Sequence, residues 1–167
     1  MIHTNSAVCF NTPCALAINK FQLINDLKET HKLLLNKLLP EIEQHLIVVF
    51  NELQVPYSGI WKVASSRFFG LCSRLEQHIQ TEESLVFPHL LNELPEEKQD
   101  LAEAFMRSHE QLEEQLLLLI ELLQNDFRVA QHLLSYRVLN EKLNYLAEIL
   151  SQHGEEEDLL FVNALKK

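Results

Sequence analysis

The chain contains few of the residues that interrupt helices. Its 167 residues include three glycines and five prolines, while leucine, glutamate and glutamine are abundant. Scarce turn-forming residues among many helix-forming ones predict an all-α protein rather than a sheet-containing one. The length is sufficient for one domain with a real hydrophobic core.

Basic residues and long apolar runs are also scarce. Lysine and arginine total 14 against 24 acidic residues, so the formal net charge is −10. This charge disfavours nucleic acid and anionic membranes as partners. No apolar run exceeds five residues, as at residues 116–120, which is far too short to cross a bilayer. No basic segment precedes an apolar core at the N-terminus, so we expect no signal peptide and a cytoplasmic location.

Cysteine is limited to Cys9, Cys14 and Cys72. An odd number without metal-ligand spacing is most simply explained by reduced thiols in a cytoplasmic protein. Metal binding or redox sensing by Cys9 and Cys14 stays open as the alternative.

Turn residues divide the chain into four predicted helices. The first covers about residues 15–53 and is expected to bend near Pro40, which has no backbone N–H group. The second is capped by Ser58 and reaches about residue 92, with Pro88 weakening its last turns.

The third predicted helix has Pro95 in its first turn and ends near residues 125–126. The fourth occupies most of the remaining chain and starts between residues 127 and 140. Residues 1–14 are expected to form an irregular arm, and residues 15–167 a single helical bundle.

One arrangement of chemically active residues occurs twice. His31 precedes His78 and Glu82, and His109 precedes His153 and Glu157; each pair on the later helix has His-x3-Glu spacing. The neighbouring residues repeat as well, because leucine follows both first histidines at three, seven and eight residues and isoleucine at eleven. An internal duplication thus supplies four imidazoles and two carboxylates.

All six of these residues interrupt apolar stripes with steps of three and four residues, so they face the interior of the predicted bundle. In an antiparallel up-down-up-down bundle, residues equidistant from a short turn meet at one level. The midpoints of His31–His78 and His78–His109 lie at or beside the turns at residues 55–59 and 92–95. The midpoint of His109–His153 lies at residue 131, past the predicted end of the third helix, and requires a longer third connection.

Six polar residues in one core layer indicate a bound cation, because an unpaired buried carboxylate is energetically costly. Imidazole and carboxylate donors without thiolate favour iron or manganese over structural zinc. We expect each histidine to cap one metal and Glu82 and Glu157 to bridge two. A metal-free His–Glu network in a scaffolding bundle is the alternative. The Glu-x-x-His spacing of ferritin-type sites is absent at these histidines.

The pattern resembles the hemerythrin-like (HHE cation-binding) superfamily over about residues 20–165. The stretch from His78 through Glu82 to Pro88 resembles the second-helix signature of that superfamily. Single histidines on the first and third helices, with His-x3-Glu on the second and fourth, are most similar to the di-iron domain of the RIC iron-centre repair proteins. The resemblance implies two iron ions joined by an oxo or hydroxo bridge, with manganese also possible.

The chain differs at named positions from two members of this superfamily, the oxygen-carrying hemerythrins and the RIC proteins. Oxygen-carrying hemerythrins have a second histidine where this chain has Glu113, although Asp158 falls at their His-x4-Asp position. RIC proteins usually begin with a cysteine-bearing domain and have an extra histidine late in the first helix, for which His45 is the available match.

Other polar residues are assigned lesser roles. We expect Glu113 to orient an imidazole, Glu83 and Glu156 to lie at the rim or in solvent, and Gly154 to leave room for a ligand or for close helix packing. His89 is expected to be a hydrogen-bonded core residue, and His3 and His132 surface residues.

Two functions are therefore predicted. In the first, the di-iron protein binds or reacts with nitric oxide, dioxygen or peroxide, or donates iron to a partner protein whose iron centre is damaged. In the second, it is an iron- or oxygen-responsive sensor that acts through a protein partner. No further residue stands out as a general acid, base or nucleophile, so turnover of a substrate stays open.

Overall fold

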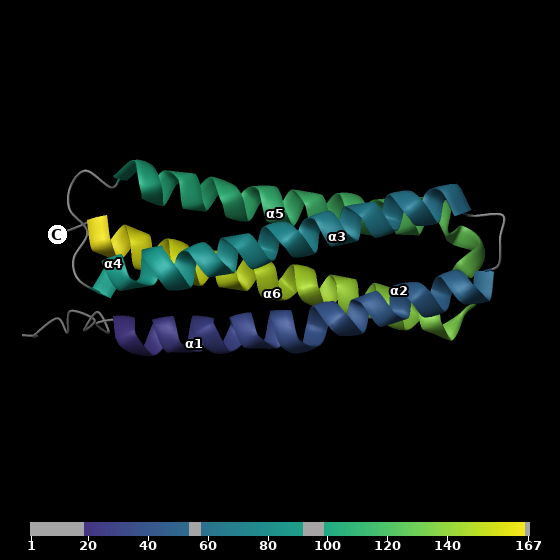
Figure 1. Cartoon of the computed structure of the whole chain (residues 1–167), viewed down its shortest axis with the longest axis horizontal. Helices are drawn as coiled ribbons and strands as arrows, with labels where there is room; N and C mark the ends of the chain where they lie inside the picture. The colour runs from purple at the N-terminus through teal and green to yellow at the C-terminus, as the bar shows by residue number, and fades with distance from the viewer. Residues whose placement is uncertain (1–18, 54–57, 92–98, 166–167) are drawn as a thin grey trace, which may run out of the picture.

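The computed structural model describes residues 19–53, 58–91 and 99–165, and all regular structure in these ranges is helical. Four long helical segments run in alternating directions (Figure 1), which confirms the predicted antiparallel up-down-up-down bundle. None of the helices in these ranges combines the length and the apolar character needed to cross a membrane. The predicted arm at residues 1–14 lies outside the described residues.

The first segment consists of α1 (Lys20–Leu33), η1 (Leu34–Leu38) and α2 (Leu39–Leu53). It begins later than predicted, because Asn19 is extended and its side chain accepts the N–H groups of Phe21 and Gln22 at 3.1 and 3.3 Å. Such a cap satisfies backbone donors that have no partner within the helix. Residues 15–18 lie outside the described part of the chain.

The second segment consists of α3 (Ser58–Thr81), η3 (Glu82–Val86) and α4 (Phe87–Leu91). The third is α5 (Gln99–Asp126), and the fourth is α6 (Leu134–Leu165). The last residues of the first and third helices agree with the prediction. The capping role predicted for Ser58 and the place predicted for Pro95 concern atoms outside the described part.

Both long segments that contain an internal proline widen into a π-turn just before it. The N–H group of Leu39 bonds to the carbonyl of Leu34 ahead of Pro40, and that of Phe87 bonds to the carbonyl of Glu82 ahead of Pro88. A π-turn accommodates a residue that lacks an N–H group and crowds the preceding turn. Figure 1 shows α1 and α2 meeting at an angle, which confirms the predicted bend.

The connection between α5 and α6 is longer than a tight turn. It contains the short 3₁₀ helix η5 (Arg128–Ala130); Phe127, directly before this helix, and Ala130, its last residue, are both buried. α6 therefore starts at Leu134, inside the predicted range. This longer connection supplies the length that the position of His153 requires.

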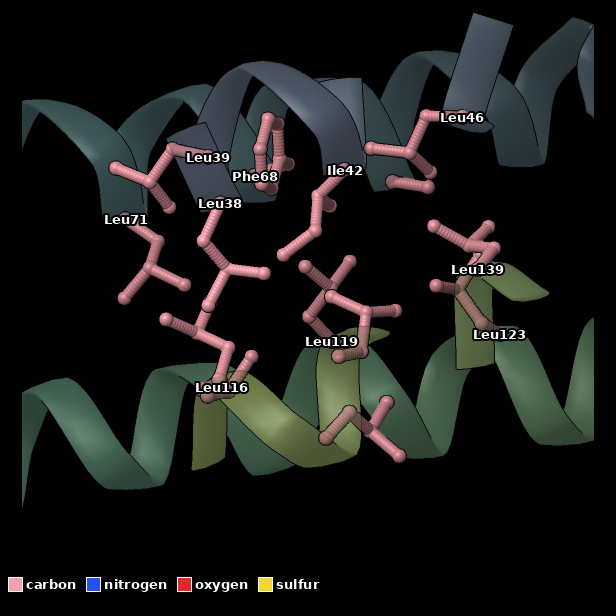
Figure 2. Packing of buried hydrophobic residues seen from close by; sticks show 14 of the residues in the cluster. Leu38, Leu39, Ile42, Leu46, Phe68, Leu71, Leu116, Leu119, Leu123 and Leu139 are labelled. Carbon is pink, nitrogen blue, oxygen red and sulfur yellow. The ribbon is translucent and has the colours of Figure 1, made fainter. Parts of the chain in front are cut away.

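The buried hydrophobic residues of the described ranges form two separate clusters. Figure 2 shows part of the large cluster, in which leucines of the four segments meet. The small cluster joins the start of α1, the end of the second segment and the end of α6; it consists of Ile24, Leu27, Val86, Phe87, Leu90, Leu160 and Phe161. The large cluster consists of Leu34, Leu38, Leu39, Ile42, Leu46, Val49, Ala64, Phe68, Leu71, Leu75, Ile79, Leu112, Leu116, Leu119, Ile120, Leu123, Phe127, Ala130, Tyr136, Leu139, Leu143, Leu146 and Leu150.

Cys72 lies half-buried on α3, packed against the large cluster, with its thiol free. Burial, together with the nearby carboxylates of Glu76 and Glu43, raises its pKa to about 12. Such a thiol is unreactive at neutral pH, because the thiolate is the reactive form. Cys9 and Cys14 lie outside the described residues.

Candidate metal centre

The structure brings all six predicted residues together in one layer between the large and the small cluster. None of them is more than 8% exposed, and Glu82 and Glu157 are each 1% exposed. They come from all four segments, as the helical spacing predicts. We call these residues the polar layer: His31, His78, Glu82, His109, His153 and Glu157.

The polar layer divides into two groups that share both carboxylates. One group is His31 and His153 with Glu82 and Glu157, and the other is His78 and His109 with the same two glutamates. Within each group the candidate ligand atoms all lie within 4.8 Å of one another. Each group also takes one histidine and one glutamate from each copy of the internal duplication, so neither copy contains a complete group.

The two oxygens of each carboxylate face different groups. Glu82 places Oε1 2.5 Å from Nε2 of His78 and Oε2 3.2 Å from Nε2 of His31. Glu157 places Oε2 2.7 Å from Nε2 of His109 and Oε1 3.2 Å from Nε2 of His153. With its oxygens placed in this way, each carboxylate could give one oxygen to a cation in each group.

The carboxylate oxygens have no hydrogen-bond partners despite these short separations. Among the described residues, neither oxygen of Glu82 or Glu157 receives a hydrogen bond, and all four oxygens are buried. Burying such oxygens without a partner costs several kcal/mol or more, by order of magnitude. Four carboxylate oxygens that lie this close to imidazoles without receiving a hydrogen bond fit a cation better than a metal-free His–Glu network.

Two of the four imidazoles are held in place by hydrogen bonds at their outer nitrogens. Nδ1 of His31 lies 2.8 Å from Oε1 of Glu83, and Nδ1 of His78 lies 2.8 Å from Oγ of Ser108. These hydrogen bonds fix the two rings and direct Nε2 towards the centre. Nδ1 of His109 lies 3.5 Å from a carboxylate oxygen of Asp158 without a hydrogen bond between them.

The contacts of Glu83 and Ser108 with the imidazoles were not predicted from the sequence. Glu83 lies at the rim as predicted, but it also orients His31. Ser108 was missed, and its position directly before His109 is the one sequence signal that points to it. Nothing in the spacing alone indicates that a serine of α5 reaches a histidine of α3.

The remaining candidates do not belong to the two groups. Glu113 is half-buried on α5, His45 is half-buried on α2, and Asp158 contacts only the outer side of His109. The carrier-type ligand pattern is therefore not reproduced among the described residues.

The other residues given lesser roles lie away from the inner atoms of the centre. His89 is half-buried, with Nδ1 2.6 Å from the carbonyl of Leu85, and His132 is exposed. Glu156 is half-buried and accepts a hydrogen bond from Gln152 at 2.9 Å. His3 lies outside the described residues.

The charges of the polar layer are strongly coupled. Burial opposes ionisation of Glu82, but His109, His31 and His78 hold the pKa of this carboxyl well below its usual range. Burial likewise opposes protonation of His109, but Glu157 and Glu82 raise its pKa to about 10. Without a cation, the protonated imidazole of His109 therefore compensates part of the buried negative charge.

This coupling predicts how the stability of the metal-free protein depends on pH. His109 stabilises the fold fully below its ordinary pKa of 6.5, and this contribution is lost as pH rises towards 10. Glu82 acts in the opposite sense, so its contribution is lost as pH falls below 4.5. Urea unfolding of metal-free protein at pH 6.5, 8 and 9.5 should show a falling free energy of unfolding. The same free energy at all three values would contradict the assignment.

Gly154 is buried where α6 meets α5. A Cβ atom added there would lie 3.4 Å from Cβ and Cγ of His109, which is ordinary contact. This geometry favours close helix packing, one of the two roles predicted for the glycine.

We expect Gly154→Ala to keep metal binding and to raise the free energy of unfolding by up to about 1 kcal/mol, because alanine favours helix. Gly154→Val should displace the imidazole of His109 and weaken metal binding. Urea unfolding and metal titration of the two variants check this, and equal metal affinity in both would contradict it.

A small cavity adjoins the polar layer on the side of the large cluster. Three of its walls are imidazoles and three are leucines: His78, His109, His153, Leu75, Leu112 and Leu150. Its volume of about 10 Å³ is roughly what one water molecule requires. The cavity therefore offers space for a very small molecule next to both groups.

Comparison with protein families gives one match. The family model of the hemerythrin HHE cation binding domain matches residues 22–165. No curated protein and no solved structure matches the chain. The match contains all six residues of the polar layer, and the similarity to RIC proteins stays a prediction.

Proposed function

The chain belongs to the hemerythrin HHE cation-binding domain family, and from this premise we propose that the polar layer holds two iron ions that bind or react with a small oxidising or nitrosative molecule. His31 and His153 would hold one ion, and His78 and His109 the other. Glu82 and Glu157 would each give one oxygen to each ion. The observation that carries the proposal is the pair of carboxylates shared by the two groups.

The donor set supports iron as the cation. Imidazole and carboxylate ligands suit iron and manganese, and thiolate, typical of structural zinc sites, is absent from both groups. When bound, iron would supply a redox-active Lewis acid for which nitric oxide, dioxygen and peroxide are small enough ligands.

The cavity beside the layer supports a small ligand. Its leucine walls keep bulk water away, and its imidazole walls belong to both groups. A space of about 10 Å³, roughly that of one water molecule, leaves room for only the smallest ligands and excludes larger metabolites. We therefore propose nitric oxide, dioxygen and peroxide as the ligand class.

The test is a ligand titration of anaerobic, iron-loaded protein, followed by its optical spectrum. We expect at least one of the three molecules to change the spectrum in a saturable way. Leu150→Phe, which fills the cavity, should weaken that response at least about tenfold while the iron content is unchanged. Leu123→Phe is the matched control, since it adds the same bulk elsewhere in the large cluster. No response from the wild-type protein, or an equal loss in both variants, would contradict the proposal.

A sensor role is the second candidate, and one observation favours it. The polar layer separates the small cluster from the large one. The packing of the small cluster therefore depends on a positive charge that balances the buried carboxylates of Glu82 and Glu157. Loss of iron would then loosen the end of the bundle that contains the small cluster, and a partner protein would bind the two states differently. Iron donation to a damaged partner is a further use of the same site, and it requires rapid iron loss to a chelator without loss of the fold.

A further inference from the structure

Two grooves reach the polar layer from opposite faces of the bundle. One lies between α1 and α6 and measures about 320 Å³, and the other lies between α3 and α5 and measures about 280 Å³. Because α1 packs against α6 and α3 against α5, the two grooves open on opposite sides. Each ends at a histidine of a different group: His153 in the α1–α6 groove and His78 in the α3–α5 groove.

The two grooves differ in charge. The α1–α6 groove is lined by the carboxylates of Asp26 and Glu156, and no lysine or arginine is among its described lining residues. The α3–α5 groove is lined by the guanidinium of Arg74, and no carboxylate is among its described lining residues. A divalent cation is therefore attracted to the first groove and repelled by the second.

His153 belongs to both the α1–α6 groove and the polar layer. Its Nε2 lies 3.0 Å from Nε2 of His31, inside the layer. The residue is 3% exposed, and its buried Nδ1 has no hydrogen-bond partner among the described residues. The corresponding nitrogen of His78 is instead bonded to Ser108. The α1–α6 groove therefore ends at the imidazole of His153, whose Nδ1 makes no hydrogen bond with the described residues.

We propose that the α1–α6 groove is the path by which divalent metal ions enter and leave the polar layer. Asp26 and Glu156 attract the ion, the hydroxyls of Thr30 and Tyr145 offer oxygens in place of its water, and His153 is the first residue of the layer that it meets. This inference rests on the proposed metal-binding function, but it concerns the rate of loading rather than the number of ions held.

The first test removes the charge of the groove. Metal-free protein is mixed with Co²⁺ in a stopped-flow instrument, and its visible absorption reports uptake. The double variant D26N/E156Q should take up Co²⁺ at least about fivefold more slowly at low ionic strength, with a smaller difference at high salt and the same final metal content. The matched control, E114Q/E121Q, removes two exposed carboxylates of α5 that line neither groove.

The second test blocks each groove in turn, using the internal duplication. Gln152 lines the α1–α6 groove directly before His153, and Gln77 lines the α3–α5 groove directly before His78. Both side chains are exposed. Gln152→Trp should slow Co²⁺ uptake, whereas Gln77→Trp should keep the wild-type rate.

The outcomes separate this inference from the proposed function. Equal rates in D26N/E156Q and its control, or slowing by Gln77→Trp as large as that by Gln152→Trp, would overturn the entry path even if two ions still bind. A wild-type protein that takes up no Co²⁺ or Fe²⁺ would overturn both proposals.

Discussion

Replacement of Glu82 by glutamine is expected to weaken the binding of both metal ions, whereas replacement of His31 by alanine is expected to weaken the binding of one. Each oxygen of Glu82 faces a different group, so Glu82→Gln affects a ligand of both ions. His31 belongs to one group only, so His31→Ala should leave the other ion bound. Removal of a residue that only orients a metal ligand typically lowers metal affinity roughly 10–100-fold. We expect Glu82→Gln to lower the affinity by more than this. Glu157→Gln should behave like Glu82→Gln.

Titration with Fe²⁺ under anaerobic conditions, read as ions bound per chain, distinguishes these variants. Glu76→Gln is the control, because Glu76 is exposed on α3, the same helix that carries His78, and belongs to neither group. Circular dichroism should show the same helix content in every variant. One tightly bound ion remaining in Glu82→Gln, or equal losses in Glu82→Gln and His31→Ala, would mean that the carboxylates do not bridge.

Removal of the metal is expected to lower stability strongly and unevenly. A ligand present at 1,000 times its dissociation constant stabilises the native state by about 4 kcal/mol. For a chain of this size that corresponds to a fall in Tm of roughly 10 °C on chelation. The loss should be largest around the small cluster, because the polar layer lies between that end of the core and the large cluster.

Hydrogen exchange with and without a chelator measures this unevenness. Amides of α1, α4 and the end of α6 should exchange faster without metal, while those of α2 and the middle of α5 in the large cluster should change little. A large loss of amide protection around the small cluster, with lower helix content, would favour the sensor role. A smaller loss with unchanged helix content would favour binding of or reaction with a small molecule. Identical exchange with and without metal would contradict a metal-dependent polar layer.

Much of the centre could be predicted because helical spacing determines which side chains share a face. Steps of three and four residues placed His31, His78, His109 and His153 on apolar stripes, and the turns fixed their levels. The midpoint of His109 and His153 fell past the predicted end of the third helix, because η5 and its flanking residues lengthen the connection between α5 and α6.

Other features depend on contacts between distant residues, which periodicity does not encode. The π-turn that begins at Glu82 follows from Pro88, yet its effect on the direction of the carboxylate requires the whole turn to be built. Ser108 reaches His78 only because α3 and α5 pack at a particular height. The division of each carboxylate between two groups likewise depends on the side-chain conformations of Glu82 and Glu157.

The duplication adds a constraint on how the centre is assembled. Each group takes its ligands from both copies of the repeated arrangement, so a single copy of two helices contains neither group complete. The centre therefore depends on the packing of all four segments, in agreement with its position between the two hydrophobic clusters.

The most direct test of this account is the metal content of the protein after anaerobic reconstitution with Fe²⁺ and removal of unbound metal by gel filtration. The two groups with shared Glu82 and Glu157 predict two irons per chain. Folded protein that retains no iron would contradict the account, and the polar layer would then be a buried His–Glu network in a helical scaffold.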